Sequence, residues 1–270
     1  MGEQGGAVSR AALGRCLAAE FLGSLFLAAI VVGSGIAAQR LSPNQVGLDL
    51  FENAAATALG LFAIILMFGP ISGAHFNPVV SLVDAAFGGL PWRSALWYMP
   101  AQFAGCIAGA IVANVMFSDA AVSLSTKHRG TGAHFVSEVV ATLGLILVIF
   151  ALARSGRSKS APAAVGAYIG AAYFFTSSTS FANPAITVGR MFSDTFAGIA
   201  PSSVPIFVLA QIVGGAAAFL VVKILYPGVT PDEAADVVVP HRERKHPVDG
   251  DTISNIAGSR GSTTSLEELR

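Results

Sequence analysis

Apolar residues along the chain gather into six long runs separated by short, more polar segments. The runs occupy roughly residues 13–38, 53–68, 95–117, 134–153, 162–178 and 204–226. A helix needs about 20 mostly apolar residues to cross the hydrocarbon core of a bilayer. We therefore predict an all-α membrane protein with six transmembrane helices, and an even number of spans leaves both termini on one side.

The two ends of the chain differ from this apolar centre. The first run is too long for the apolar region of a cleaved signal peptide, so we expect it to remain as the first span, after a short segment at residues 1–12. Residues 228–270 are rich in Pro, Asp, Gly, Ser and Thr and lack a helical period. We predict one membrane domain over residues 13–227 and a disordered tail over residues 228–270.

Basic residues in the loops indicate which side of the membrane holds the termini. The loop between the fourth and fifth runs contains Arg154, Arg157 and Lys159 and no acidic residue. By the positive-inside rule, this side is cytoplasmic. The bias is incomplete, because loops predicted on the opposite side contain Arg40, Lys127 and Arg129. We expect a multi-pass protein of the cell membrane with both terminal segments in the cytoplasm.

Composition agrees with a membrane protein and excludes other classes. Charged residues make up 12% of the chain, against about 25% in soluble domains, so most of the chain does not face water. The net charge is zero, which gives no indication of nucleic-acid binding. The two cysteines, Cys16 and Cys106, lie in apolar runs without the spacing of a disulfide framework or a metal site. We expect neither a metal nor a cofactor.

An internal repeat relates the two halves of the chain. Ala-Glu-Phe at 19–21 matches Ser-Glu-Val at 137–139, and Asn-Pro-Val at 77–79 matches Asn-Pro-Ala at 183–185. The segment that contains Gln102 matches the one that contains Gln211, in the same order and at similar spacing. Each half, about 13–118 and 133–227, contains three spans. The halves are therefore inverted and related by an axis in the membrane plane.

Two short segments between spans, residues 69–87 and 177–189, are too short to cross the membrane. Each begins with small and polar residues, continues with Asn-Pro, and ends in a short apolar run. Asn is a favourable N-cap and Pro suits the first helical position, so Asn77 and Asn183 each predict a helix start. Ten helical residues extend about 15 Å, half of the hydrocarbon core. We expect two half-helices that meet N-terminus to N-terminus beside a pore, because non-helical backbone at this depth needs a watery cavity or a protein environment.

These motifs resemble those of the aquaporin and glycerol-facilitator family, the major intrinsic proteins. Residues 72–79 (SGAHFNPV) resemble the first family motif and residues 183–185 resemble the second. The residues at matching supporting positions are Glu20, Glu138, Gln102 and Gln211. The resemblance extends over about residues 10–227 and implies an hourglass channel domain with two re-entrant half-helices, usually as a homotetramer with one pore per subunit. Val79 stands where the family usually has Ala.

The resemblance places the pore centre at the two Asn-Pro motifs: Asn77, Pro78, Val79, Asn183, Pro184 and Ala185. Each half-helix N-terminus presents about half a positive charge, which repels cations. The Asn side chains can donate hydrogen bonds to a passing oxygen and so interrupt a chain of water molecules. Backbone carbonyls are expected to accept hydrogen bonds along the path at Gly73, Ala74, His75, Thr179, Ser180 and Phe181. Small neutral solutes would exchange hydration for these contacts at low cost.

Glu20 and Glu138 are ionisable residues inside the membrane, and such residues are usually functional. One interpretation is a proton relay. The other, which the family resemblance implies, is that each carboxylate accepts hydrogen bonds from a re-entrant loop and fixes its position. We favour the structural role, because a relay needs a chain of ionisable partners. Gln102 and Gln211 are expected to support the loops through interhelical hydrogen bonds.

The family usually has Arg directly after the second motif, and this chain has Ile186 there. The resemblance places Ser180 in the same constriction, and counting along the spans adds Thr57 and Ala171. A filter of these four residues would have no charge and no aromatic ring, so we expect a wide, arginine-free filter. Arg190 lies one helical turn beyond Ile186. It either adds charge to the outer mouth or extends to water from the helix end.

We therefore predict a passive channel for small uncharged solutes: water, glycerol-like solutes and neutral metalloid hydroxides, the last by resemblance to arsenic-resistance channels. The alternatives are a water-selective channel, an ion-leaky channel, a closed member with a structural role, and an ion-coupled transporter. A transporter would need a coupling-ion site, and the sequence shows no paired intramembrane charges beyond the two symmetric Glu residues. We expect no enzyme, because His75, His128 and His134 lack a nucleophile or a metal-spaced partner.

Overall fold

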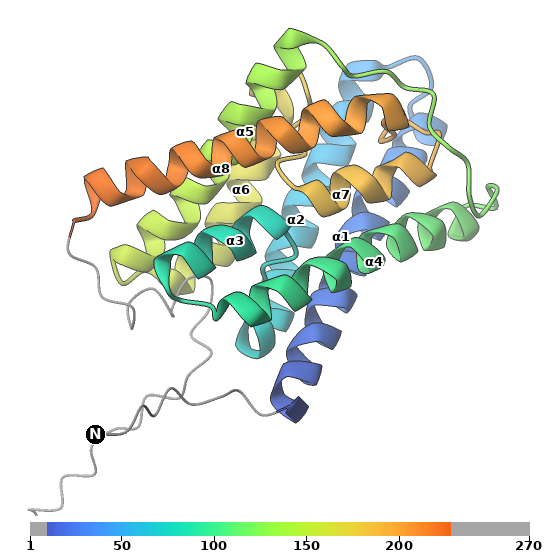
Figure 1. Cartoon of the computed structure of the whole chain (residues 1–270). Coiled ribbons are helices and arrows are strands. Elements are labelled where there is room, and N and C mark those ends of the chain that lie inside the picture. Colours follow the sequence, from blue (N-terminus) through green and yellow to red (C-terminus); the bar gives the residue numbers. More distant parts are fainter. Residues whose placement is uncertain (1–9, 228–270) are drawn as a thin grey trace, which may run out of the picture.

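The computed structural model describes residues 10–227, and within that range every regular element is a helix (Figure 1). The six long helices are α1 (Arg10–Leu41), α2 (Val46–Ser72), α4 (Trp92–Met116), α5 (Gly132–Arg154), α6 (Ala161–Phe175) and α8 (Val204–Leu225). Two short helices, α3 (Pro78–Phe87) and α7 (Pro184–Gly189), follow α2 and α6. The predicted order of six long helices and two half-helices is confirmed. The predicted tail, residues 228–270, lies outside the described residues, and so does most of the segment 1–12, whose last three residues already belong to α1.

Among the described helices, five are long and apolar enough to cross a membrane. The remaining long helix, α6, has 15 residues, which extend about 22 Å. Its predicted range was too long at the C-terminal end, because the backbone becomes extended at Thr176. A 3-10 turn, Ser158–Ser160, continues α6 at its N-terminal end.

The helices of the two halves pack in equivalent pairs. α1 packs along α4 in the first half, α5 packs along α8 in the second, and α2 against α6 joins the halves. A Cβ added to Gly105 of α4 would lie 2.3 Å from the carbonyl oxygen of Phe21, and one added to Gly214 of α8 would lie 2.5 Å from that of Val139. The α1–α4 contact and the α5–α8 contact therefore each need a glycine, and the two glycines are at equivalent positions in the repeat.

The half-helices begin as the sequence predicts. Asn77 is extended, and its Oδ1 accepts a hydrogen bond from Val79 N at 2.9 Å. Asn183 does the same for Ala185 N at 2.9 Å. α3 has ten residues, but α7 has six and continues as a 3-10 turn, Arg190–Phe192. Each half-helix contacts both α4 and α8 and lies between them (Figure 1).

The outer surface is rich in large apolar side chains, and some ionisable side chains are buried. Large apolar side chains such as Leu59, Leu96 and Leu220 are more than half exposed. Glu20 and Glu138, in contrast, are fully buried. Apolar outward faces with polar groups inside are the arrangement that a lipid bilayer favours.

We predict that Gly105→Ala destabilises the protein and that Gly14→Ala does not. The added methyl group at position 105 would collide with backbone, whereas at position 14 it meets no atom within 4 Å. Overpacking of this kind costs about 1–3 kcal/mol, which should lower the Tm in detergent by roughly 2–12 °C. Equal Tm values for the two variants would contradict the close packing of α1 and α4.

Candidate functional site: a pore between the half-helices

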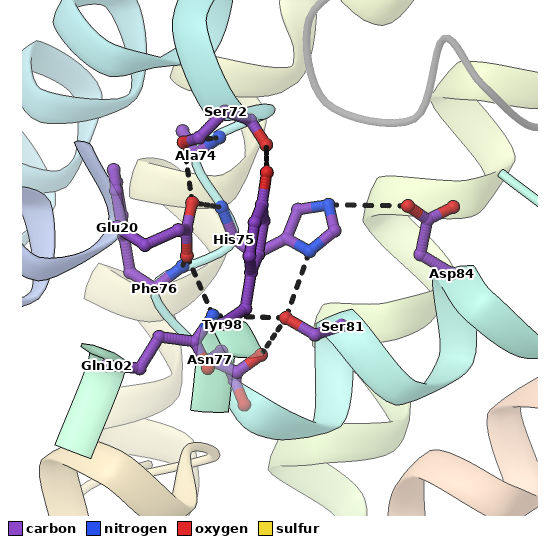
Figure 2. A network of polar contacts seen from close by, with 10 residues as sticks. All are labelled: Glu20, Ser72, Ala74, His75, Phe76, Asn77, Ser81, Asp84, Tyr98 and Gln102. Atoms are coloured by element: carbon purple, nitrogen blue, oxygen red, sulfur yellow. Dashed lines mark hydrogen bonds and ion pairs between the residues drawn. The ribbon is translucent and has the colours of Figure 1, made fainter. Parts of the chain in front are cut away.

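A buried carboxylate in α1 organises the loop that leads into α3 (Figure 2). Glu20 accepts hydrogen bonds from Ser72 Oγ at 2.6 Å, His75 N at 3.0 Å, Phe76 N at 2.7 Å and Gln102 Nε2 at 2.7 Å. These donors come from the end of α2, the loop and α4. The carboxylate thus connects three segments around the start of the half-helix.

The second half repeats this arrangement. Glu138 of α5 accepts hydrogen bonds from Ser178 Oγ at 2.6 Å, Phe181 N at 2.9 Å, Ala182 N at 2.8 Å and Gln211 Nε2 at 2.7 Å. No donor to either carboxylate is an acidic or basic side chain. This favours the structural role over a proton relay, because a relay needs ionisable neighbours.

The two glutamines also connect the long helices to the half-helices. Gln102 Nε2 donates to Ser81 Oγ in α3 at 3.0 Å, and Gln211 Nε2 donates to Thr187 Oγ1 in α7 at 2.9 Å. Ser81 and Thr187 in turn donate to the carbonyls of Asn77 and Asn183 at 3.2 and 2.7 Å. The half-helices therefore have fixed positions relative to α4 and α8.

Both entry loops contain residues in the left-handed region of backbone space. These residues are Gly73, Ala74 and Phe76 in the first loop and Thr179, Ser180 and Ala182 in the second. The two sets occupy equivalent places relative to the two Asn-Pro motifs. A non-glycine residue in this region costs about 1–3 kcal/mol and persists where the surrounding contacts enforce it. Here the hydrogen bonds to Glu20 and Glu138 enforce it.

The same hydrogen bonds orient the carbonyl groups. In a trans peptide the C=O of one residue points opposite to the N–H of the next. Because the N–H groups of His75 and Phe76 point to Glu20, the carbonyls of Ala74 and His75 point away from it, and both residues line the cavity. The equivalent carbonyls in the second half are those of Ser180 and Phe181.

The carbonyls of Gly73 and Thr179 follow by the same argument. The N–H groups of Ala74 and Ser180 donate to the hydroxyl oxygens of Ser72 and Ser178, which are themselves bound to the two glutamates. Gly73 and Thr179 do not line the cavity, and the pore role of the six carbonyls stays a prediction.

The two asparagines connect the halves at the centre. Asn77 Nδ2 donates to Ala182 O at 2.8 Å, and Asn183 Nδ2 donates to Phe76 O at 2.7 Å. A side-chain amide has two N–H groups, so each asparagine retains one donor for a solute. Both residues line the central cavity.

The other motif residues support the centre from behind. Pro78, Val79, Pro184 and Ala185 are buried in the first turns of the half-helices and do not line the cavity. A Cβ on Gly215 of α8 would lie 2.4 Å from Val79 Cγ1, so this glycine provides the space that Val needs where the family usually has Ala.

The cavity beside the half-helices has two different walls. One wall consists of apolar side chains from the long helices: Leu27, Val31, Leu61, Ile65, Leu145, Ile149, Val165 and Ile169. The other carries the entry-loop residues and the two asparagines. The cavity has a volume of about 60 Å³, far below the roughly 300–1,000 Å³ of a ligand-binding pocket. A solute in this narrow space contacts both walls.

Three of the four predicted filter residues line the cavity, and the fourth prediction was wrong. Thr57, Ser180 and Ile186 face the lumen. Ala171 is exposed on the outer side of α6 and does not line it. Counting along the sequence does not fix the rotation of a helix, and the prediction therefore selected a residue on the wrong face.

Tyr173 occupies the place predicted for Ala171. Residues 165, 169 and 173 are spaced four apart, so they share the face of α6 that lines the cavity. The hydroxyl of Tyr173 lies 3.1 Å from Thr57 Oγ1. An aromatic ring therefore lines the cavity beside Thr57, which the sequence did not predict.

Arg190 also lines this part of the cavity. It is 2% exposed and lines the cavity, so the alternative in which it extends to water is wrong. Its guanidinium carbon lies 3.4 Å from the centroid of the Phe181 ring. We call the end of the cavity formed by Tyr173, Ser180, Ile186 and Arg190 the α7 mouth.

His75, which lines the cavity, contacts two buried polar side chains of α3 that the sequence did not assign to the site (Figure 2). His75 Nδ1 lies 3.0 Å from Ser81 Oγ, and its Nε2 lies 3.4 Å from Asp84 Oδ2. Asp84 is fully buried in α3. An acidic residue within a re-entrant segment was the feature that could have identified it.

Metal binding has no visible basis in the part of the chain that the structure describes. Among residues 10–227, no three His, Cys, Asp or Glu side chains are grouped so that they could hold an ion.

Comparisons with known proteins agree with this geometry. The family model described as "Major intrinsic protein" matches residues 7–182. An aquaglyceroporin, AqpS, of Rhizobium meliloti (strain 1021) is 45% identical over 217 residues, covering 80% of this chain and 92% of the relative. A glycerol uptake facilitator protein of Streptococcus pneumoniae is 33% identical over 147 residues, covering 49% of this chain and 62% of the relative.

A solved structure shows the same fold. The X-ray structure of the aquaglyceroporin from Plasmodium falciparum superposes with a TM-score of 0.61 at 21% identity, covering 80% of this chain and 98% of that one. The inverted pair of half-helices and the carboxylate-anchored loops define a membrane channel. The chain belongs to the major intrinsic protein family.

We predict that Glu138→Gln destabilises the protein and lowers solute flux. A glutamine would present N–H groups to donors that need an acceptor, and each unpaired buried donor costs about 1–3 kcal/mol. Glu52→Gln is the control, because Glu52 has one hydrogen-bond donor, Ser42 Oγ, among the described residues. The measurements are Tm in detergent and stopped-flow water flux in liposomes. Normal Tm and flux in Glu138→Gln would contradict the structural role.

Proposed function

We propose that this protein is a passive channel for water and for small uncharged solutes of the glycerol type. The two-walled lumen carries the proposal. A polyol has hydroxyl groups on one side and hydrocarbon on the other. One wall of the lumen contains the entry loops and the asparagines, and the other consists of apolar side chains, so each side of the polyol meets a matching wall. The solute exchanges its hydration for these contacts without chemistry. The printed names of the two relatives, an aquaglyceroporin and a glycerol uptake facilitator, support the same solute class.

The absence of an arginine next to the second motif supports a solute larger than water. Ile186 lines the lumen and places no hydrogen-bond donor there through its side chain. Ser180 also lines the lumen, and its small side chain leaves further room for a solute. Neutral metalloid hydroxides such as arsenous or boric acid carry hydroxyl groups at similar spacing to a polyol, and we extend the proposal to them.

We further propose a homotetramer in the cell membrane with both termini in the cytoplasm. The bias of basic residues toward the loop between α5 and α6 supports this orientation. The exposed apolar side chains of the long helices support contact with lipid and with other subunits. As a channel, the protein would act without being an enzyme.

We predict that purified protein in liposomes conducts glycerol and that Ile186→Arg reduces glycerol flux by about tenfold or more. The long charged side chain would narrow the α7 mouth. Ile186→Leu keeps the size and polarity of the residue, so its flux should match that of the wild type. Stopped-flow light scattering with glycerol, boric acid or arsenous acid as osmolyte gives the rates.

The outcome that contradicts the proposal is a wild-type channel that passes water but none of these solutes. A glycerol flux that is equal in Ile186→Arg and the wild type would show that position 186 does not control the constriction.

A further inference from the structure

Arg190 has free hydrogen-bonding capacity inside the pore. Its Nε donates to the carbonyl oxygen of Ala197. Within residues 10–227, neither terminal nitrogen of its guanidinium group donates a hydrogen bond to the protein. A guanidinium has five N–H groups, so four remain on the side chain that lines the cavity. These are the strongest charged donors at the α7 mouth.

The ring of Phe181 keeps this side chain in place. The guanidinium carbon of Arg190 lies 3.4 Å from the ring centroid, a cation–π contact. The backbone N–H of Phe181 is bound to Glu138 Oε1 at 2.9 Å. The carboxylate that orients the entry loop therefore also positions the surface on which the arginine rests.

A second buried arginine lies on the same ring. Arg129, from the loop between α4 and α5, has its guanidinium carbon 5.3 Å from the Phe181 centroid. It donates to the carbonyl oxygens of Gly198 at 3.0 Å and Ser178 at 3.3 Å. It does not line the cavity, so it contributes charge from behind the wall.

Among the described residues, neither arginine forms an ion pair with a carboxylate, although Glu138 lies near enough to attract both. Two buried positive charges that form no ion pair thus lie beside the α7 mouth, and the N-terminus of α7, the positive end of its dipole, faces the pore centre.

We propose that Arg190, with Arg129 behind it, replaces the missing filter arginine from one helical turn further along α7. In this role Arg190 donates hydrogen bonds to solute oxygens and repels protons and cations, while Ile186 leaves the constriction wide. The inference rests on the proposed function as a solute channel. With Arg190 in this role, the channel selects neutral solutes and is not an ion-leaky pore.

The expected effect is measurable. In a medium of effective dielectric constant about 20, one unit charge at about 10 Å changes the equilibrium for a second charge by more than about tenfold. Removing the charge of Arg190 should therefore raise proton or cation permeability by about tenfold or more.

The experiment measures proton and sodium leak and glycerol flux in the same liposomes for four proteins: wild type, Arg190→Gln, Arg40→Gln, and Arg190→Gln combined with Ile186→Arg. Arg40 is an exposed arginine bonded to Phe117 O at 2.8 Å and to Asp119, so its variant controls for lost charge away from the lumen. We expect a leak in Arg190→Gln, none in Arg40→Gln, and restored tightness in the double variant. A purely structural role of Arg190 would not be rescued by an arginine at position 186.

Two results would overturn the proposal: an Arg190→Gln channel that conducts glycerol and stays as tight to protons and sodium as the wild type, or a wild-type channel that conducts cations freely. The cation conductance of the wild type is measured without any variant, so this test remains available if Arg190→Gln fails to fold. A wild-type protein with no solute flux would instead contradict the proposed function.

Discussion

A buried carboxylate that binds backbone N–H groups is the interaction on which the pore depends. The entry loops run through the membrane interior without helical hydrogen bonds, and unpaired backbone groups at that depth are costly. Glu20 and Glu138 satisfy the N–H groups on one side of each loop. The carbonyl of each of these peptides points away from the carboxylate. The hydrogen bonds that satisfy the backbone N–H groups therefore also leave carbonyl groups available to a solute.

The inverted repeat turns this local solution into a channel. Each half places one half-helix at half the depth of the membrane, and the cross-bonds between Asn77 and Ala182 and between Asn183 and Phe76 join them. Since each asparagine caps its own helix with Oδ1, its orientation is fixed by two bonds. The departures from symmetry occur at the α7 mouth, where α7 is short and Arg190 follows it.

Local sequence patterns could predict most of the fold and the centre of the site. Apolar runs set the spans, and Asn-Pro set the half-helix starts, because both depend on neighbouring residues. Tyr173 could not be placed by counting, since the rotation of α6 is set by its packing and by the length of the loop that follows. Arg129 was also beyond prediction, because a residue in a long loop enters the site through tertiary contacts. Arg190 was recognised as a candidate, but its burial depends on Phe181 and Ala197.

Hydrogen exchange of the entry-loop amides tests the central claim most directly. The amides of His75, Phe76, Phe181 and Ala182 lie beside a lumen open to water, yet each donates to a buried carboxylate. We predict that they exchange slowly in reconstituted protein, at rates similar to those of the α1 and α5 interior, because exchange requires the hydrogen bond to open. Exchange as fast as that of the amide of Asn44, in the exposed turn between α1 and α2, would show that the carboxylates do not hold the loops.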